Sequence, residues 1–173
     1  DVVGYSRLMA DDFDATSERM VQARAVVERG LNEHSGQLVN FVGDNFMATF
    51  HSAMDGVRAA IAITTALEEL NGDSPSSRWL RFRMGMDRGE VAVSDGNYEG
   101  DALNVSARIQ ALARHGGLSA SGAVYRELDE PALRFRTTGY HRLKNIPEPV
   151  EIFDFADLPT GGGASTTSQS LSL

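Results

Sequence analysis

The chain has 173 residues, of which 42% are hydrophobic, and this is enough for one domain with a sizeable core. Its formal net charge of -8 argues against a surface that binds nucleic acid, because phosphate neutralisation needs clustered Lys and Arg. The chain has no cysteine, which excludes disulfides, thiolate metal sites and a thiol nucleophile. Its longest apolar run, residues 59–63, is far shorter than the roughly 20 residues of a spanning helix, so we expect no direct membrane contact in this segment. The lack of cysteine is compatible with a reducing cytosol, and we expect a cytoplasmic domain, with membrane tethering through other segments of the full-length protein left open.

The first half of the chain has two helical patterns with a hairpin signal between them. Asp14 and Thr16 are both suitable N-caps for the first helix. The β-rich runs that follow are separated by Gly-Asp-Asn, residue types suited to the positive φ values of a tight turn. We expect helices at about 14–34 and 53–71 and strands at 37–42 and 46–50.

The second half of the chain alternates strand and helix patterns. We expect strands at 79–86 and 90–93 around a turn at 87–89, a helix at 101–114, a strand at 118–121, a helix at 122–128, and strands at 133–143 and 150–155. This order favours an α/β (α+β) sandwich with helices packed on a mostly antiparallel sheet. Residues 1–158 form the expected domain, and residues 159–173 have the Gly/Ser/Thr-rich composition of a tail or linker.

Two distant aspartates are candidates for a metal site. Asp1 begins a β-rich segment and Asp44 lies at the expected hairpin tip, so sheet pairing would bring them side by side. Two adjacent carboxylates repel each other unless a cation lies between them, and oxygen ligands suit Mg²⁺ or Mn²⁺. If Asp1 lies on a strand, most of that strand precedes it, and we expect the chain to be a fragment of a longer protein.

The segment after Asp1 is a candidate phosphate loop. Val3, Gly4, Tyr5 and Ser6 lead into the start of a helix or turn, where exposed backbone N–H groups bind phosphate oxygens and glycine permits close approach. The signal depends on its position directly after Asp1, since short glycine turns are common.

The expected helix after Gly100 has one apolar face and one polar face. Asn104 and Arg108 are four residues apart and share a side of the helix, while Val105, Ile109 and Leu112 lie on a neighbouring apolar side. An amide and a guanidinium are therefore presented together, and a guanidinium offers a fixed fork of donors to phosphate oxygens.

The string Gly-Asp-x-x-Asn-x-x-x-Arg at 100–108, together with Asp1–Ser6 and Gly43-Asp44, resembles the catalytic domain of the class III nucleotidyl cyclases, the adenylate and guanylate cyclase family. The resemblance covers about residues 1–156. It implies a ferredoxin-like arrangement and a reaction in which a nucleoside triphosphate gives a 3′,5′-cyclic nucleotide and pyrophosphate.

The resemblance also implies roles for single residues. Asp1 and Asp44 would hold two divalent metals, with the backbone carbonyl of Val2 as a further ligand. Asn104 would orient the ribose, and Arg108 would stabilise charge on the α-phosphate. Lys144, the single lysine of the chain, would reach the β- or γ-phosphate.

The base-recognising positions are less typical of the family. Asp101 matches one position, and its carboxylate can accept a hydrogen bond from the exocyclic amine of adenine or cytosine. Asn40 stands at the other, where the family usually has Lys or Glu. Because an amide both donates and accepts, Asn40 is compatible with guanine and pyrimidines as well.

We therefore expect a nucleotidyl cyclase that uses ATP, with two Mg²⁺ or Mn²⁺ ions in each site. The resemblance implies a head-to-tail homodimer in which the aspartates of one chain face Asn104 and Arg108 of the other. Alternatives are a guanylate or pyrimidine nucleotide cyclase, a catalytically silent nucleotide-binding regulatory module, and a plain ferredoxin-like interaction domain.

Overall fold

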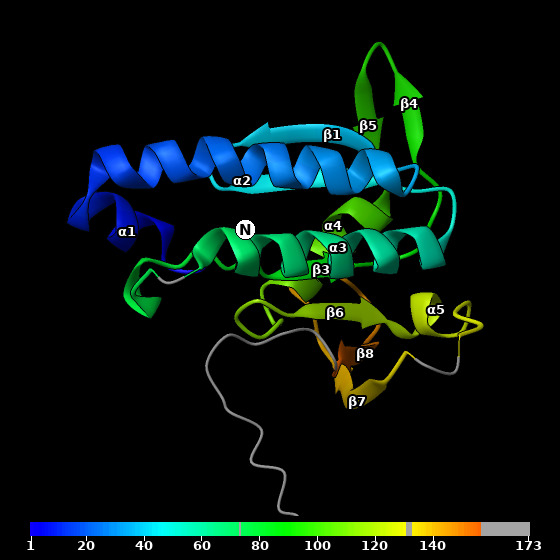
Figure 1. The fold of residues 1–173 in the computed structure, drawn as a ribbon. Coiled ribbons are helices and arrows are strands. Elements are labelled where there is room, and N and C mark those ends of the chain that lie inside the picture. Colours follow the sequence, from blue (N-terminus) through cyan, green and yellow to red (C-terminus); the bar gives the residue numbers. More distant parts are fainter. Residues whose placement is uncertain (73, 131–132, 157–173) are drawn as a thin grey trace, which may run out of the picture.

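The computed structural model describes residues 1–72, 74–130 and 133–156 as a mixed α+β domain (Figure 1). The expected tail at 159–173 lies outside the described residues. The helices are α1 (Tyr5–Asp11), α2 (Phe13–Glu33), α3 (Ala53–Asn71), a 3-10 turn η1 (Ser76–Arg78), α4 (Asp101–Gln110) and α5 (Gly122–Tyr125). The strands are β1 (Gln37–Val42), β2 (Asn45–Thr49), β3 (Met84–Met86), β4 (Ala92–Ser94), β5 (Asn97–Glu99), β6 (Leu118–Ser121), β7 (Phe135–His141) and β8 (Val150–Phe155).

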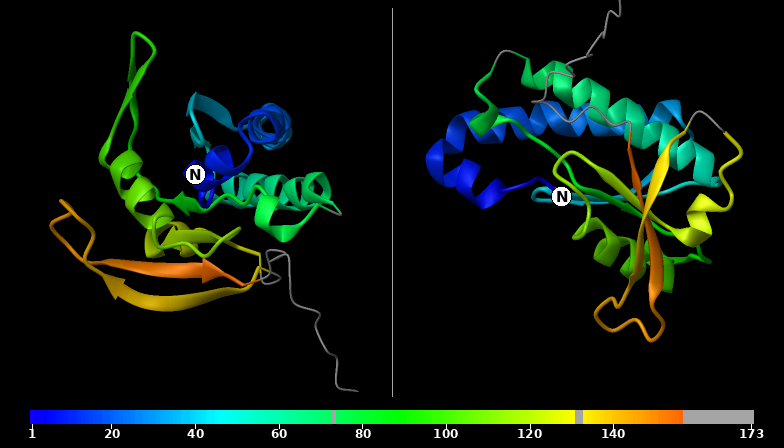
Figure 2. Two further views of the ribbon diagram at one scale, coloured as in Figure 1. Left: turned by 90° about the vertical axis from the view of Figure 1, so that its left-hand side faces the viewer. Right: turned by 90° about the horizontal axis from the view of Figure 1, so that it is seen from below.

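The main sheet has the order β3-β6-β8-β7. Strands β3 and β6 are parallel, and the other two pairings are antiparallel, so the expected mostly antiparallel sheet is confirmed. Helices α2 and α3 lie on one side of β3 and α4 lies on the other (Figure 2). The larger apolar core lies between α2, α3 and the strands, where residues such as Val27, Ile63 and Leu118 are fully buried.

The β1–β2 hairpin forms as the sequence predicts, with a tight turn at Gly43 and Asp44. Gly43 has φ 60, a left-handed conformation that favours glycine. The register shifts between Leu38 and Asn40, where Leu38 pairs with Ala48 and Asn40 pairs with Met47. Residue 39 is therefore an extra residue in β1, a β-bulge.

The first three residues connect this hairpin to the rest of the domain. The Val2 N–H donates to the Asp44 carbonyl at 3.2 Å, and Val2 forms an antiparallel bridge with Phe82. The Val3 N–H donates to the Arg81 carbonyl, and the Arg83 N–H donates to the Asp1 carbonyl, both at 2.8 Å. Asp1 is consequently half-buried next to the hairpin (Figure 2).

Several sequence predictions need correction at their ends. The α2 N-cap is Asp12, whose carboxylate accepts from the Ala15 N–H at 3.2 Å, and not Asp14 or Thr16. Thr16 is buried, and its hydroxyl donates to the Leu8 carbonyl of α1 at 2.9 Å. The helix or turn expected after Gly4 is α1, whose bounds could not be predicted because seven residues are too few for a visible period.

The expected strand pair around residues 87–89 is wrong. Strand β3 covers only 84–86 and pairs with β6, while β4 pairs with β5 in a hairpin of its own that projects from the domain (Figure 1). The reason is the turn chemistry at Asp95 and Gly96, which both have positive φ and close this second hairpin.

Helix α4 packs closely on β3 because Gly85 has no side chain. A Cβ at this position would collide with the backbone of α4 at Ser106 and Gln110. The close approach holds the helix against the strand that follows Arg83.

The extended segment 80–83, which pairs with Asp1–Val3 ahead of β3, is fixed at its start by one buried asparagine. Asn71, only 2% exposed, donates to the Leu80 carbonyl at 3.1 Å and accepts from the Leu80 N–H at 2.9 Å. Its carbonyl oxygen also accepts from Arg19 at 2.9 Å. A single side chain thus supplies both backbone partners of Leu80.

We predict that Asn71→Ala lowers the free energy of unfolding by about 2–4 kcal/mol, because it leaves both backbone groups of Leu80 without partners in a buried position. The measurement is urea unfolding followed by circular dichroism. The control Asn32→Ala, at an exposed position of α2, should change stability by no more than about 0.5 kcal/mol. Equal losses in the two variants would contradict the role assigned to Asn71.

Candidate functional site

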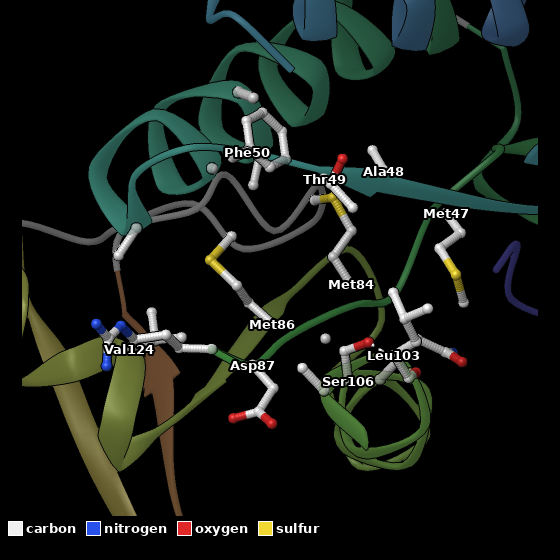
Figure 3. A pocket seen from close by; sticks show the side chains of 18 of the residues that line it. Met47, Ala48, Thr49, Phe50, Met84, Met86, Asp87, Leu103, Ser106 and Val124 are labelled. Atoms are coloured by element: carbon white, nitrogen blue, oxygen red, sulfur yellow. Dashed lines mark hydrogen bonds between the residues drawn. The ribbon is translucent and has the colours of Figure 1, made fainter. Parts of the chain in front are cut away.

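A cleft of about 560 Å³ lies between the β2–α3 segment on one side and β3 with α4 on the other (Figure 3). Met47, Phe50, Met84 and Met86 form much of its apolar wall, and Leu103 and Ser106 face it from α4. Its lining also includes Asp1, Arg83 and Gln110. The cleft therefore brings the first residue of the chain next to α4.

The structure brings Asp1, Val2 and Asp44 together, as sheet pairing predicted. The Val2 N–H bonds the Asp44 carbonyl, which fixes the hairpin turn beside the first strand. The Asp44 side chain lies close enough to Asp1 to interact with it electrostatically. Asp1 thus lines the cleft, and Asp44 lies in the turn next to it.

The Asp1 carboxylate is held by two side chains that the sequence analysis did not find. Arg83 donates from Nη2 to Oδ2 at 2.8 Å and from Nε to Oδ1 at 3.1 Å, in the bidentate geometry of a strong ion pair. The Gln110 amide also donates to Oδ1. These contacts join residues 82 and 109 positions apart, so no local pattern could have shown them.

The donor set at this point suits a hard divalent cation. Two carboxylates and the Val2 carbonyl are oxygen ligands, the type that Mg²⁺ and Mn²⁺ prefer. Among the described residues, no group of three or more His, Cys, Asp or Glu is placed to hold a metal. The expected set has only two carboxylates, so a bound ion would take its remaining ligands from substrate and water.

The candidate phosphate loop follows directly. Gly4 has φ 66 and precedes α1, and its carbonyl accepts from the N–H groups of Arg7 and Leu8. Tyr5 and Ser6 are the first residues of α1, and Gly4 and Ser6 are exposed. The segment thus turns sharply beside Asp1 and Val3.

Helix α4 divides its side chains between three directions. Ala102, Val105 and Ile109 are buried, and the last two pack against Leu143 and Ile152. Asp101, Asn104 and Arg108 are all exposed. Leu103, Ser106 and Gln110 line the cleft.

The helical period separates Arg108 from the Asp1 of its own chain. At about 100° per residue, Asn104 and Arg108 lie roughly 120° and 160° around the helix from Gln110. Gln110 is the α4 side chain that reaches Asp1, so Asn104 and Arg108 point away from Asp1 into solvent. One chain alone does not place its guanidinium opposite its own aspartates.

Lys144 and Asn40 occupy separate exposed positions. Lys144 lies in the β7–β8 turn next to Leu143, which packs on α4, so the turn is held beside this helix. Asn40 is exposed in β1, on the hairpin that carries Asp44. The predicted residues thus form two groups, one around Asp1 and the hairpin and the other on and beside α4.

We predict that the two faces of α4 respond differently to truncation. Val105→Ala should lower the free energy of unfolding by about 1–3 kcal/mol because it leaves a cavity against Leu143. Arg108→Ala should change it by no more than about 0.5 kcal/mol, since the side chain is exposed. Urea unfolding measures both values, and a large loss in Arg108→Ala would show that the guanidinium has a structural role.

Comparison with known proteins gives one consistent pattern, although no family model matches the chain. The protein named "Putative adenylate cyclase 3" from Rhizobium meliloti is 35% identical over 158 residues, which are 90% of this chain and 27% of the relative. The chain therefore spans about a quarter of that protein's length.

Solved structures agree with this sequence match. An adenylate/guanylate cyclase/hydrolase from Silicibacter pomeroyi is 29% identical with a TM-score of 0.81, and the match covers 92% of this chain and 93% of that one. The guanylate cyclase domain of RhGC from Catenaria anguillulae, in complex with GTP, shares the fold with a TM-score of 0.69 at 15% identity, covering 90% of this chain and 92% of that one. Among the described residues, no helix has the length and apolar character needed to cross a membrane.

Proposed function

Because the chain belongs to the class III adenylate/guanylate cyclase family, we propose that it is a nucleotidyl cyclase domain that converts ATP to 3′,5′-cyclic AMP and pyrophosphate. The observation that supports the proposal is the backbone pairing of distant segments, which brings Asp1 and Val2 beside Asp44 and places Asp1 in the lining of the cleft. The relatives' names include both adenylate and guanylate cyclases, so the choice of ATP rests on this chain's own residues.

Asp1, Asp44 and the Val2 carbonyl would hold two Mg²⁺ or Mn²⁺ ions. Such ions lower the pKa of a ribose 3′-hydroxyl and neutralise a triphosphate during in-line attack on the α-phosphorus. The backbone N–H groups of residues 4–6 would bind phosphate oxygens beside them, whereas the N–H of Val3, also expected there, already donates to the Arg81 carbonyl.

Asn104 and Arg108 would complete the site from a second chain. Asn104 would orient the ribose, and Arg108 would stabilise the charge that develops on the α-phosphate. Lys144, beside α4, would bind the β- or γ-phosphate. Since both residues of α4 point away from their own Asp1, a head-to-tail homodimer supplies the missing half of each of two equivalent sites.

Asp101 supports adenine as the base. When ionised, its carboxylate accepts hydrogen bonds and donates none, which matches the exocyclic amine of adenine and repels a keto oxygen. Asp101 is exposed in the first turn of α4, on the side that carries Asn104. Asn40 would contact the base from the hairpin and is compatible with several bases.

We predict that two inactive variants restore activity when mixed. Asp44→Ala and Arg108→Ala should each lower kcat by at least about 10²-fold. Random dimer exchange leaves one intact site in each mixed dimer, so an equimolar mixture should recover about one quarter of the wild-type activity. Asn104→Ala mixed with Arg108→Ala is the control, since both lesions fall in the same half-site and the mixture should remain inactive. Absence of rescue in the first mixture would count against a shared site.

We predict that ATP is the best substrate among the four common ribonucleoside triphosphates. Initial rates of cyclic nucleotide and pyrophosphate formation, measured with Mn²⁺ and each triphosphate in turn, provide the test. Preference for GTP, CTP or UTP would assign a different base specificity. Tight nucleotide binding without product would favour the silent regulatory module, and neither binding nor product would favour the interaction domain.

A further inference from the structure

The carboxylate of Asp1 has three hydrogen-bond donors in this structure. We name Arg83 and Gln110 together the Asp1 clamp, because both bind this carboxylate and both also line the cleft. The side chains of Asp1 and Arg83 are 26% and 27% exposed, so the pair is partly shielded from solvent. A shielded ion pair is screened less than one on the surface.

The clamp limits how Asp1 can bind a cation. A carboxylate has about four lone-pair positions, and the clamp uses two on Oδ1 and one on Oδ2. The remaining position is on Oδ2. Asp1 is therefore left with one oxygen for a cation, and a bidentate contact would require the clamp to open.

The clamp also changes the charge that a cation meets. Asp1 and Asp44 together carry two negative charges, and the Arg83 guanidinium in contact with Asp1 cancels one of them. Arg88, the other arginine in the cleft lining, is paired with Glu127. The pair of aspartates that would otherwise attract a free divalent ion strongly is thus half neutralised.

We propose that Arg83 is a positioning residue that makes divalent-metal binding at Asp1 and Asp44 dependent on the nucleotide. This inference rests on the proposed function, since the triphosphate supplies the negative charge that Arg83 removes. Without nucleotide, the half-neutralised site binds the ion weakly; with nucleotide, phosphate oxygens add both charge and ligands. Metal and nucleotide then bind with positive coupling, and each raises the affinity for the other by the same factor.

Gln110 is the uncharged residue of the clamp. Its amide binds Oδ1 without altering the charge of the site, and it lies on α4 two residues after Arg108. It therefore holds the free lone pair of Oδ2 in one direction while Arg83 sets the charge. A substitution that changes charge at either position should shift the metal affinity according to its sign.

The test is a titration of Mn²⁺ into the whole chain, followed by electron paramagnetic resonance of the free ion, with and without a non-cyclising ATP analogue. The variant Arg83→Gln removes the charge and should raise the affinity for Mn²⁺ alone by at least about tenfold. The enhancement produced by the nucleotide analogue should fall by the same factor. Arg83→Lys keeps the charge and should stay within about threefold of the wild type for Mn²⁺ alone.

Two further variants keep the test decisive. Gln110→Lys adds a positive charge beside Oδ1 and should weaken binding of Mn²⁺ alone by at least about threefold. This variant tests the effect of added rather than removed positive charge, and its result does not depend on whether Arg83→Gln folds. Arg58→Gln is the matched control, because Arg58 forms its ion pair with Glu130, outside the clamp, and Mn²⁺ binding should not change.

Unchanged or weaker binding of Mn²⁺ alone in Arg83→Gln would overturn the inference. If Asp44→Asn abolishes Mn²⁺ binding in that same series, the proposed function stands and only the role of Arg83 fails. If neither the wild type nor any variant binds Mn²⁺ with or without the nucleotide analogue, the proposed function fails with it.

Discussion

The backbone pairing of Asp1–Val3 is the constraint on which the candidate site depends. These residues form hydrogen bonds with Arg81 and Arg83 on one side and with Asp44 on the other. The pairing brings Asp1 beside the turn that carries Asp44, and it aligns Arg83 with the carboxylate of Asp1. Asn71 holds the start of the partner strand, so the geometry of the site is linked to the buried end of α3.

Helix α4 is the second organising element, because the side chains on three of its sides make three different kinds of contact. One side anchors it through Val105 and Ile109, and another carries Gln110 to Asp1. The third presents Asn104 and Arg108 to solvent. A helix that contacts its own Asp1 through one side points Arg108 to another, and this separation is the reason for proposing a site shared by two chains.

Much of the fold follows from local sequence patterns, whereas the contacts of Asp1 do not. Helix α3 and strands β1, β6 and β8 have the expected bounds, because capping residues, glycines and apolar periods mark their ends. The fold class and the family are confirmed. The error around residues 87–89 arose because β3 pairs with a strand more than thirty residues later, and a short strand in isolation does not reveal its partner. The roles of Arg83 and Gln110 could not be predicted for the same reason. An arginine next to a strand and a glutamine at a helix end are common on protein surfaces, and their partner Asp1 is distant in the sequence.

The β-bulge in β1 has a consequence for how this hairpin tolerates change. Side chains alternate between the two faces of a strand, so one extra residue reverses the alternation for everything between it and the turn. Deleting residue 39 would leave Gly43 and Asp44 intact as a turn. It would, however, move the side chain of Asn40 to the opposite face of the hairpin from the face it occupies now, relative to Gln37 and Leu38. Chain length in this short stretch is therefore constrained independently of side-chain chemistry, and single-residue deletions there would be more disruptive than most substitutions.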